Sequence, residues 1–253
     1  MSLSGGKFTI VAGSTGSVGR LIVQTCLSDP RIEKVAAIVR TTVPKEKAET
    51  LWGSANTSKL TQIQVDFTSL DTNNEALRTE FQGADAFITG LGLYSGRVTE
   101  AEMDMVEGKY NSLLATIAHE SGAKRGAYLS GQGVKQPTLE GRAFAMFGRA
   151  KGRAEESLVN IFSDPSGEGH VSARPGAIFD RPGAPVYGFF DSMLTCWPFS
   201  ALKDTRFGIS AYDIAKGMVQ GALFDTENGN IIWENEQIKE AARRYDTNFE
   251  GKE

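Results

Sequence analysis

The sequence predicts an α/β fold in which a doubly wound, mainly parallel sheet carries helices on both faces. Two observations lead to this prediction. Apolar runs of strand length alternate with helical patterns from the N-terminus onward, as they do in successive βαβ units. The first apolar run also ends in a glycine-rich turn that opens a helical pattern. With 253 residues, of which 40% are hydrophobic, the chain is long enough to bury the core of a single domain over residues 1–253.

The first three elements are predicted from local patterns near the N-terminus. A strand is expected over 7–12, where the segment KFTIVA is largely apolar. The next helix, 17–27, should end before Pro30, because proline cannot continue a helix. A second strand is expected over 34–40 (KVAAIVR), and the polar stretch over 41–59 is expected to form loops.

The middle of the chain repeats the alternation. Apolar runs predict strands over 62–67, 84–90, 126–130 and 170–173. Helical patterns between them predict helices over 70–81, 99–121 and 144–162. The second of these helices has apolar residues every three or four positions, at Met103, Val106, Tyr110, Leu113, Leu114 and Ile117. Such a stripe is typical of a helix that packs on a sheet.

The C-terminal part is expected to add a small substrate lobe. The stretch over 179–207 is rich in proline, glycine and aromatic residues and should be irregular, and a helix over 212–224, a short strand over 230–234 and a terminal helix close the domain. Residues 179–210 are expected to form a lid over an apolar substrate. A core patch or a shallow contact with a membrane surface are the alternatives. The aromatic and apolar cluster in question is Tyr187, Phe189, Phe190, Met193, Trp197 and Phe199.

Composition and charge exclude several classes of protein. The formal net charge is −4, from 27 basic and 31 acidic residues, so we expect no dedicated binding of nucleic acid, which favours basic surfaces. No apolar run approaches the roughly 20 residues of a membrane-spanning helix, and no leader segment is expected. Cys26 and Cys196 are too far apart in sequence for a metal knuckle. A reduced, cytoplasmic protein without a metal site is the simplest interpretation.

The strongest motif is a glycine-rich turn between the first strand and the first helix. The chain has 28 glycines, well above the usual share of roughly 7%. Three of them belong to the motif Gly13-Ser14-Thr15-Gly16-Ser17-Val18-Gly19. Gly13 would permit the tight turn, Gly16 would let the backbone approach a pyrophosphate, and Gly19 would let helix and strand pack closely. The phosphates would lie at the positive N-terminus of the helix. The motif therefore predicts an NAD(P)-binding Rossmann fold.

The end of the second strand indicates which dinucleotide is bound. NAD-binding units usually place an acidic residue there, which accepts a hydrogen bond from the ribose 2′-hydroxyl. This chain has Arg40 instead, and a guanidinium matches a 2′-phosphate. NADP(H) is therefore favoured over NAD(H), the alternative being a solvated arginine. Asp66 could contact the adenine or only form a turn, and Gly90-Leu91-Gly92 could let the backbone pass close to the cofactor or be plain turn residues.

These residues resemble the atypical branch of the short-chain dehydrogenase/reductase superfamily, and more narrowly the oxidoreductase family of the human Tat-interacting protein of 30 kDa. The resemblance covers nearly the whole chain. It is carried by the glycine-rich turn with Arg20, Val39-Arg40, Val65-Asp66-Phe67, Leu91-Gly92, Leu129-Ser130, Lys151-Gly152, Arg174-Pro175-Gly176 and Glu234-Asn235. It implies NADPH-dependent reduction of a carbonyl compound and contacts of Asp66, Phe67, Leu91, Gly92, Pro175 and Gly176 with the cofactor.

In that superfamily a serine polarises the carbonyl, a tyrosine donates the proton, and a lysine four residues later holds the nicotinamide ribose and lowers the pKa of the tyrosine. The resemblance assigns the serine to Ser130 and the lysine to Lys151. The position of the tyrosine holds Phe147, which has no proton to donate. The proton would then come from solvent or from Tyr94, which follows the fourth strand.

Two functions of different classes remain open from the sequence. The first is a reductase that acts on a small apolar carbonyl compound, with Ser130, Lys151 and Tyr94 as catalytic candidates. The second is a non-catalytic NADP(H)-binding regulatory or interaction protein, in keeping with Phe147 in place of tyrosine. A third, weaker hypothesis is an isomerase or cyclase that uses the cofactor structurally. His119 and His170 have no partner at catalytic or metal spacing and are expected to be structural.

Overall fold

The computed structural model describes residues 6–53, 57–93, 98–132, 134, 143–183, 203, 205, 207–225 and 228–250. Seven parallel strands form the main sheet in the order β3-β2-β1-β4-β5-β6-β9. They are β1 (Lys7–Ala12), β2 (Ile32–Val39), β3 (Leu60–Gln64), β4 (Ala86–Thr89), β5 (Arg125–Leu129), β6 (Gly169–Ala173) and β9 (Ile231–Trp233). The strand order reverses between β1 and β4, so the expected doubly wound parallel sheet is confirmed. At such a reversal the crevice beyond the carboxyl ends of the strands binds ligands.

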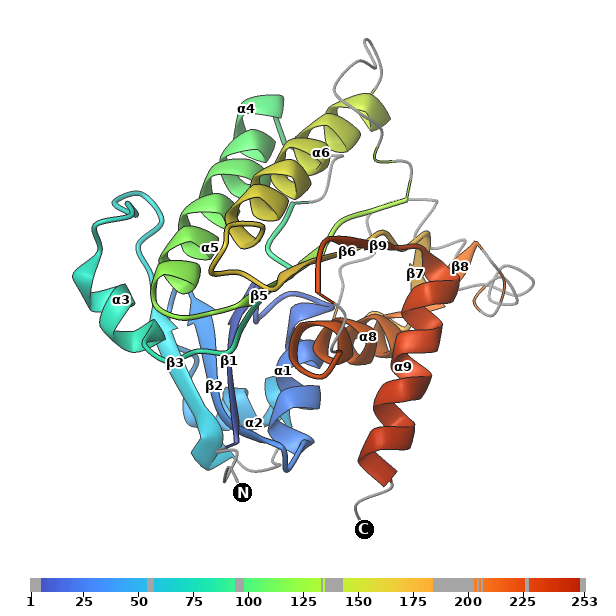
Figure 1. Cartoon of the computed structure of the whole chain (residues 1–253), viewed down its shortest axis with the longest axis horizontal. Helices are drawn as coiled ribbons and strands as arrows, with labels where there is room; N and C mark the ends of the chain where they lie inside the picture. The colour runs from blue at the N-terminus through green and yellow to red at the C-terminus, as the bar shows by residue number, and fades with distance from the viewer. Residues whose placement is uncertain are drawn as a thin grey trace.

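Helices cover both faces of this sheet (Figure 1). One face carries α1 (Gly19–Ser28), α2 (Lys45–Trp52), α8 (Ala211–Leu223) and α9 (Asn235–Glu250). The other carries α3 (Glu75–Phe81), α5 (Asn111–Glu120) and α6 (Ala143–Phe162), with α4 (Glu100–Met103) above them. A 3₁₀ turn, η1 (Thr57–Lys59), precedes β3, and a π-helical segment, η2 (Asp104–Tyr110), joins α4 to α5.

The side chains on the two faces of the central strand β1 belong to two separate hydrophobic cores. Val11 packs with the side chains of α1 and α8 on one face. Phe8, Ile10 and Ala12 point to the other face and pack with α3, α5 and α6. Strand side chains alternate between faces, so an uninterrupted apolar run is what a strand buried on both sides requires. This explains why the largely apolar run over 7–12 predicts a strand at the centre of the sheet.

Three predictions about the elements need correction. The stretch over 41–59 contains α2 and η1 rather than loops only; α2 buries just Ala48 and Trp52, which is too few apolar residues to give a helical pattern. The third strand ends at Gln64 rather than residue 67. The helix predicted over 70–81 begins at Glu75, because Asn74 caps it by accepting a hydrogen bond from the backbone N–H of Leu77 at 3.0 Å.

The helix predicted over 99–121 is one continuous helical segment with a π-helical middle, and the remaining elements match their predicted ranges within one or two residues. A second sheet of two parallel strands, β7 (Ala177–Phe179) and β8 (Gly208–Ser210), begins and ends the segment expected to be a lid. The aromatic cluster of that lid lies outside the described residues, so the lid remains a prediction. In the part of the chain that the structure describes, no helix has the length and apolar character to cross a membrane.

Candidate functional site

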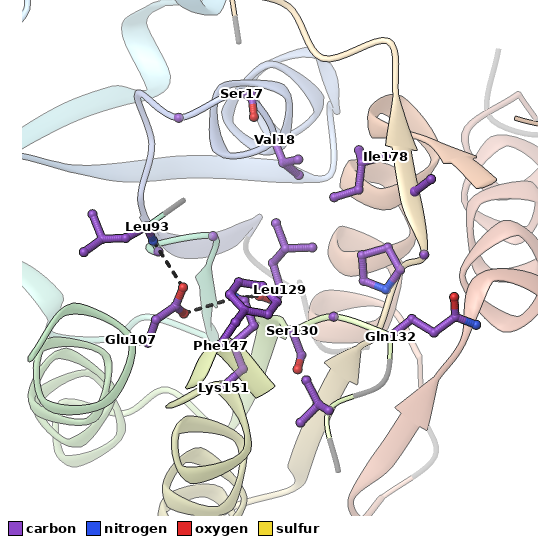
Figure 2. A pocket seen from close by; sticks show the side chains of 18 of the residues that line it. Ser17, Val18, Leu93, Glu107, Leu129, Ser130, Gln132, Phe147, Lys151 and Ile178 are labelled. Carbon is purple, nitrogen blue, oxygen red and sulfur yellow. Dashed lines mark hydrogen bonds and ion pairs between the residues drawn. The ribbon is translucent and has the colours of Figure 1, made fainter. Parts of the chain in front are cut away.

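A cavity of about 620 Å³ opens at the carboxyl ends of β1, β4, β5 and β6, at the reversal of the strand order (Figure 2). It brings together segments that are far apart in sequence. Its lining includes the glycine-rich turn and the loop after β4, and also the ends of β5 and β6 and one side of α6. The lining residues are Gly16, Ser17, Val18, Gly90, Gly92, Leu93, Glu107, Leu129, Ser130, Gly131, Gln132, Val134, Phe147, Gly148, Lys151, Pro175, Gly176, Ala177, Ile178 and Arg181.

The glycine-rich turn has a geometry that only glycine permits at two positions. Gly13 has a φ of +71°, and a Cβ there would lie 2.5 Å from the backbone nitrogen of Leu91. A Cβ on Gly19 would lie 2.0 Å from the carbonyl oxygen of Gly13. These contacts fit the predicted roles of Gly13 in the turn and of Gly19 in close packing. The turn closes through a hydrogen bond from the Gly16 N–H to the Gly13 carbonyl at 2.9 Å.

The helix that follows the turn presents its N-terminus to the cavity. No side chain caps α1 at Val18, and its first turn has no acidic residue, so the N-terminal end of the helix dipole is suited to an anion. Gly16, Ser17 and Val18 line the cavity here, and Thr15 is exposed at the edge of the turn. The predicted phosphate contacts of these residues fit this geometry.

Ser14 differs from the other residues of the motif because its side chain points into the protein. Its buried hydroxyl donates a hydrogen bond to the carbonyl of Ile38 at 2.6 Å, and its own carbonyl accepts one from Trp52 Nε1 at 2.8 Å. Ser14 therefore ties the turn to β2 and α2. A contact between Ser14 and a cofactor would involve its backbone.

The adenine side of the predicted site has an exposed arginine and a turn. Arg40 follows β2, is exposed, and has no hydrogen bond or ion pair within the described residues. The carboxylate of Asp66 accepts hydrogen bonds from the backbone N–H and hydroxyl of Thr68 and from the hydroxyl of Ser69. These bonds lower the pKa of Asp66 and favour the turn-forming alternative. Phe67 packs against Tyr110, with ring centroids 5.0 Å apart.

At the opposite end of the cavity the structure brings Ser130, Phe147 and Lys151 together. The hydroxyl of Ser130 is buried and has no hydrogen-bond partner among the described residues. Buried hydroxyls are nearly always hydrogen-bonded in folded proteins. The Ser130 hydroxyl is therefore suited to a hydrogen bond with a ligand. The ring of Phe147 lies 5.2 Å from the Lys151 Nζ, because the two residues are four apart on α6.

Lys151 already has three hydrogen-bond acceptors. Its Nζ donates to Glu107 Oε2 at 3.1 Å, to the Tyr128 hydroxyl at 3.3 Å and to the carbonyl of Leu129 at 2.9 Å. An ammonium group has three N–H donors, so a ligand that takes a hydrogen bond from Lys151 must replace one of these partners. The Tyr128 hydroxyl donates to the same Glu107 oxygen at 2.7 Å. Burial, with the negative charge of Glu107, raises the pKa of Tyr128 well above its ordinary value.

Glu107 is fully buried and is held from three sides. Its other oxygen, Oε1, accepts a hydrogen bond from the backbone N–H of Leu93 at 3.2 Å. A Cβ on Gly92 would lie 2.4 Å from that oxygen, so the absent side chain of Gly92 makes room for the carboxylate. Gly92 was predicted to let the backbone approach a cofactor, and the structure gives it this additional role.

The π-helical segment η2 determines where Glu107 points. Asn111, at the start of α5, donates to the carbonyls of Val106 and Glu107 in this segment and to the carbonyl of Leu91 after β4. Its Oδ1 accepts a hydrogen bond from the hydroxyl of Thr89 at 2.5 Å. The amide of Asn111 therefore connects the wide helical turn to the loop that lines the cavity. Single π-turns inside helices are frequent at functional sites.

Sequence reasoning missed Glu107 and Tyr128. One signal for Glu107 was present: it lies four residues after Met103 and seven before Leu114, on the face of the helix that is otherwise apolar and buried. A charged residue on a buried face is a candidate for a site. Tyr128 lay inside an apolar strand pattern, and nothing in that pattern distinguished it from an ordinary core residue.

The end of β6 is fixed by two polar contacts. Arg174 forms a bidentate ion pair with Glu155 of α6, and the N–H of Gly176 donates to Asn235 Oδ1 at 2.9 Å. A Cβ on Gly176 would lie 2.5 Å from the carbonyl of Phe207. Pro175 and Gly176 therefore form a fixed part of the cavity wall, and their predicted contacts with a cofactor remain a prediction. Tyr94, the alternative proton donor, lies outside the described residues.

The two histidines lie away from the cavity lining. His119 Nε2 lies 3.0 Å from a carboxylate oxygen of Asp164, and its Nδ1 contacts the carbonyl of Ala123. His170 is buried beside Phe162, and burial lowers its pKa to about 3. Among the described residues, no group of three histidine, cysteine or acidic side chains is arranged to hold a metal ion.

Comparisons with solved structures show the same fold in several oxidoreductases. ElxO with NADP bound has a TM-score of 0.64 at 13% identity, covering 90% of this chain and 97% of that one. The short-chain dehydrogenase/reductase YIR035C of Saccharomyces cerevisiae has a TM-score of 0.61 at 14% identity, over 93% and 99% of the two chains. A mutant short-chain dehydrogenase/reductase of Serratia marcescens has a TM-score of 0.63 at 16% identity, over 92% and 98%.

At 13–16% identity, these similarities show that the chain shares the fold of these proteins. The narrower resemblance, to the family of the Tat-interacting protein, remains a prediction, since the sequence matches none of the curated proteins. The family model described as NAD(P)H-binding matches residues 13–220, a span that runs from the first glycine of the turn to α8. The chain therefore belongs to the NAD(P)H-binding family.

Proposed function

We propose that the protein binds NADP(H) along the carboxyl ends of the strands, with the pyrophosphate on the glycine-rich turn and the nicotinamide in the cavity. One observation carries this proposal. Gly16, Ser17 and Val18 line the same cavity as Ser130, Phe147 and Lys151. The features predicted to hold the phosphates and the reactive ring therefore share one continuous space. Ser130 lines this space, and its buried hydroxyl has no hydrogen-bond partner among the described residues.

The preference for NADP(H) over NAD(H) rests on Arg40. Its exposed guanidinium follows β2 and has no partner within the described residues, so it is available to a 2′-phosphate. A charge-assisted, bidentate contact of that kind adds about 1.5–3 kcal/mol, which corresponds to roughly a tenfold to hundredfold preference.

Calorimetric titration with NADPH and NADH tests this preference. The wild-type protein should bind NADPH more tightly. Arg40→Ala should weaken NADPH binding by about tenfold or more and leave NADH binding unchanged. Arg243→Ala, which removes an exposed arginine paired with Glu240 on α9, is the charge-matched control and should change neither affinity. Equal affinities of the wild-type protein for the two dinucleotides would rule out the assignment of Arg40.

For the reaction, we propose reduction of a small, mostly apolar carbonyl compound. When bound, NADPH would supply the hydride for this reduction. Ser130 donates a hydrogen bond to the carbonyl oxygen, and Lys151 places positive charge beside it. The apolar side chains of Leu129, Phe147 and Ile178 form walls that suit an apolar substrate and exclude water. The proton comes from solvent or from Tyr94, and residues 179–210 close over the substrate as a lid.

The second candidate is a non-catalytic NADP(H)-binding regulatory or interaction protein. Two observations favour it: Phe147 carries no proton, and all three donors of Lys151 are engaged within the protein. A tyrosine-to-phenylalanine variant of ElxO, which shares this fold with a TM-score of 0.62 at 13% identity over 90% and 97% of the two chains, is described with NADPH bound. Binding without the phenol therefore has a parallel in the fold.

Loss of NADPH absorbance with a panel of carbonyl compounds distinguishes the two candidates. Consumption of NADPH by the wild-type protein with any member supports the reductase. If the wild-type protein consumes none and Phe147→Tyr does, the native protein is not a reductase of the tyrosine type and the regulatory role is favoured. Either function suits the cytoplasm, where the buried free thiol of Cys26 would stay reduced.

A further inference from the structure

Glu107, Tyr128 and Lys151 form a cluster that is needed neither to build the fold nor to shape the glycine-rich turn. All three side chains are buried, and they come from three different elements, η2, β5 and α6. Both Glu107 and Lys151 line the cavity. A buried ion pair of this kind contributes little to stability compared with apolar residues of similar size, so its presence at a cavity wall points to the ligand.

The hydrogen bonds of Lys151 differ in how easily a ligand can replace them. The Tyr128 hydroxyl is the most distant partner, at 3.3 Å, and it keeps its own acceptor on Glu107 at 2.7 Å if Lys151 turns away. Glu107 and the carbonyl of Leu129 would still hold the ammonium. Lys151 can thus turn one N–H into the cavity while two anchors keep its position and its charge.

We propose that Glu107 is a positioning residue for the bound dinucleotide: its carboxylate keeps Lys151 charged and directs one of its N–H donors into the cavity. This inference rests on the proposed binding of NADP(H). Without Glu107, Lys151 would be a buried ammonium with two neutral acceptors.

Other charged groups near Lys151 are already paired. Glu155 lies one turn further along α6 and is engaged by Arg174. Arg181, at the far side of the cavity, has an interaction of its own. Within the described part of the chain, Glu107 is the acidic residue paired with Lys151. Removal of its charge should therefore act on Lys151 first.

The test is the affinity for NADPH at about pH 7 and about pH 9, measured by calorimetry on the wild-type protein and Glu107→Gln. A lysine has an ordinary pKa of about 10.4, and burial without a counter-charge lowers it. The wild-type affinity should change by less than about twofold between the two pH values. Glu107→Gln should lose about tenfold in affinity at pH 9 relative to pH 7, because burial without the counter-charge of Glu107 disfavours the charged ammonium.

Further variants separate positioning from a structural effect. Tyr128→Phe removes the phenol and keeps both charges, so it should show the wild-type pH dependence. Glu107→Asp keeps the charge at a shorter reach and should restore most of the affinity at pH 9. In a Lys151→Met background, Glu107→Gln should have no further effect on NADPH affinity, since it acts through the lysine. Thermal unfolding of each variant confirms that it is folded. If Lys151→Met does not fold, Glu107→Asp and Tyr128→Phe still test the proposal.

The possible results have distinct meanings. If the wild-type protein does not bind NADPH, the proposed function fails and this inference fails with it. If the wild-type protein binds NADPH and Glu107→Gln has the same pH dependence as wild type, only the role of Glu107 is overturned. A pH-dependent loss in Tyr128→Phe as large as that in Glu107→Gln would also overturn it, because the phenol would then be the group that controls Lys151.

Discussion

The two ends of the cavity are constructed in different ways. At the glycine-rich turn, the geometry comes mostly from the backbone of seven consecutive residues: a Cβ on Gly19 would meet Gly13, while a Cβ on Gly13 would also meet the backbone of Gly90 and Leu91 after β4. At the other end, Tyr128 meets Glu107 and Lys151 across separations of 21 and 23 residues along the chain, and these contacts join side chains to one another. The first end is local in sequence, and the second exists only once the sheet and helices have assembled.

This difference has a consequence for how each end responds to substitution. A new Cβ in the turn meets rigid backbone that cannot move aside. A change in the cluster instead alters a balance of buried charges, which a second substitution can restore. Binding of the dinucleotide phosphates should therefore tolerate little variation, whereas the reactive end can accept Phe147 in place of tyrosine and still keep a charged lysine.

The largest expected effect on the free energy of unfolding comes from removing one charge of the buried pair. Lys151→Met leaves the carboxylate of Glu107 buried without its counter-charge, and we expect the free energy of unfolding to fall by about 3–5 kcal/mol. The double variant Glu107→Gln with Lys151→Met removes both charges and should recover most of that loss. Urea unfolding of the two variants measures both values. A double variant no more stable than Lys151→Met would show that the pair does not act as a unit.

A substitution in the glycine-rich turn should have a smaller effect on stability. Gly19→Ala places a Cβ 2.0 Å from the Gly13 carbonyl oxygen, so the turn must shift, and we expect a loss of about 2–3 kcal/mol in the free energy of unfolding together with loss of NADPH binding. Gly108→Ala is the matched control, since a Cβ there has no atom within 4 Å. It should stabilise the helix by up to about 1 kcal/mol. Equal effects of the two variants would contradict the backbone account of the turn.

His170 is a buried group without a hydrogen-bond partner among the described residues, in contrast to the paired cluster of Glu107, Tyr128 and Lys151. His170, on β6 in the same half of the molecule, is buried with both ring nitrogens unpaired among the described residues. Its pKa is about 3 in the folded protein and about 6.5 in the unfolded chain. Between these values the unfolded chain binds a proton that the folded protein does not, so stability is full above about pH 6.5 and falls by about 1.4 kcal/mol per pH unit below it.

The measurement compares urea unfolding at about pH 7 and about pH 5 for the wild-type protein and His170→Leu. Carboxylates such as Asp164, whose pKa is lowered by hydrogen bonds from Ser166 and by His119, contribute equally to both proteins. The wild-type protein should therefore lose about 2 kcal/mol more than the variant. Identical losses would mean that His170 titrates normally and is accessible to water.

The smallest expected effects distinguish one serine at each end. Ser14→Ala removes the hydrogen bond to the Ile38 carbonyl and should lower the free energy of unfolding by about 1 kcal/mol. Ser130→Ala removes a buried hydroxyl that has no partner in the described structure, and it should leave stability unchanged or raise it by up to about 1 kcal/mol. Thermal unfolding of both variants gives the comparison. A marked loss for Ser130→Ala would reveal a structural role in place of a ligand contact.

The sequence allowed prediction of the fold and of the local end of the site. The strand, the glycine-rich turn and the helix over 7–27 follow from short-range rules about apolar runs, glycine and proline. Phe147 and Lys151 could be placed on one side of a helix from their spacing alone. Each of these inferences needs only neighbouring residues.

The remainder depended on contacts between distant segments. Glu107 was hidden because its carboxylate is satisfied by Lys151, Tyr128 and the loop after Gly92, and no local pattern specifies those partners. The helix α2 was missed because it buries only Ala48 and Trp52, and the contact that fixes Trp52 is a hydrogen bond to the carbonyl of Ser14, 38 residues earlier. For Asp66 the sequence left a turn and a ligand contact open, and only the hydrogen bonds of its carboxylate favoured the turn.

The most direct test of the central claim is a crystal structure of the protein grown with NADPH. We expect the pyrophosphate beside the backbone of Gly16 and at the N–H groups of Ser17 and Val18, the 2′-phosphate beside Arg40, and the nicotinamide in the cavity near Ser130 and Lys151. A dinucleotide bound away from the glycine-rich turn, or a cavity that stays empty at saturating NADPH, would contradict the account.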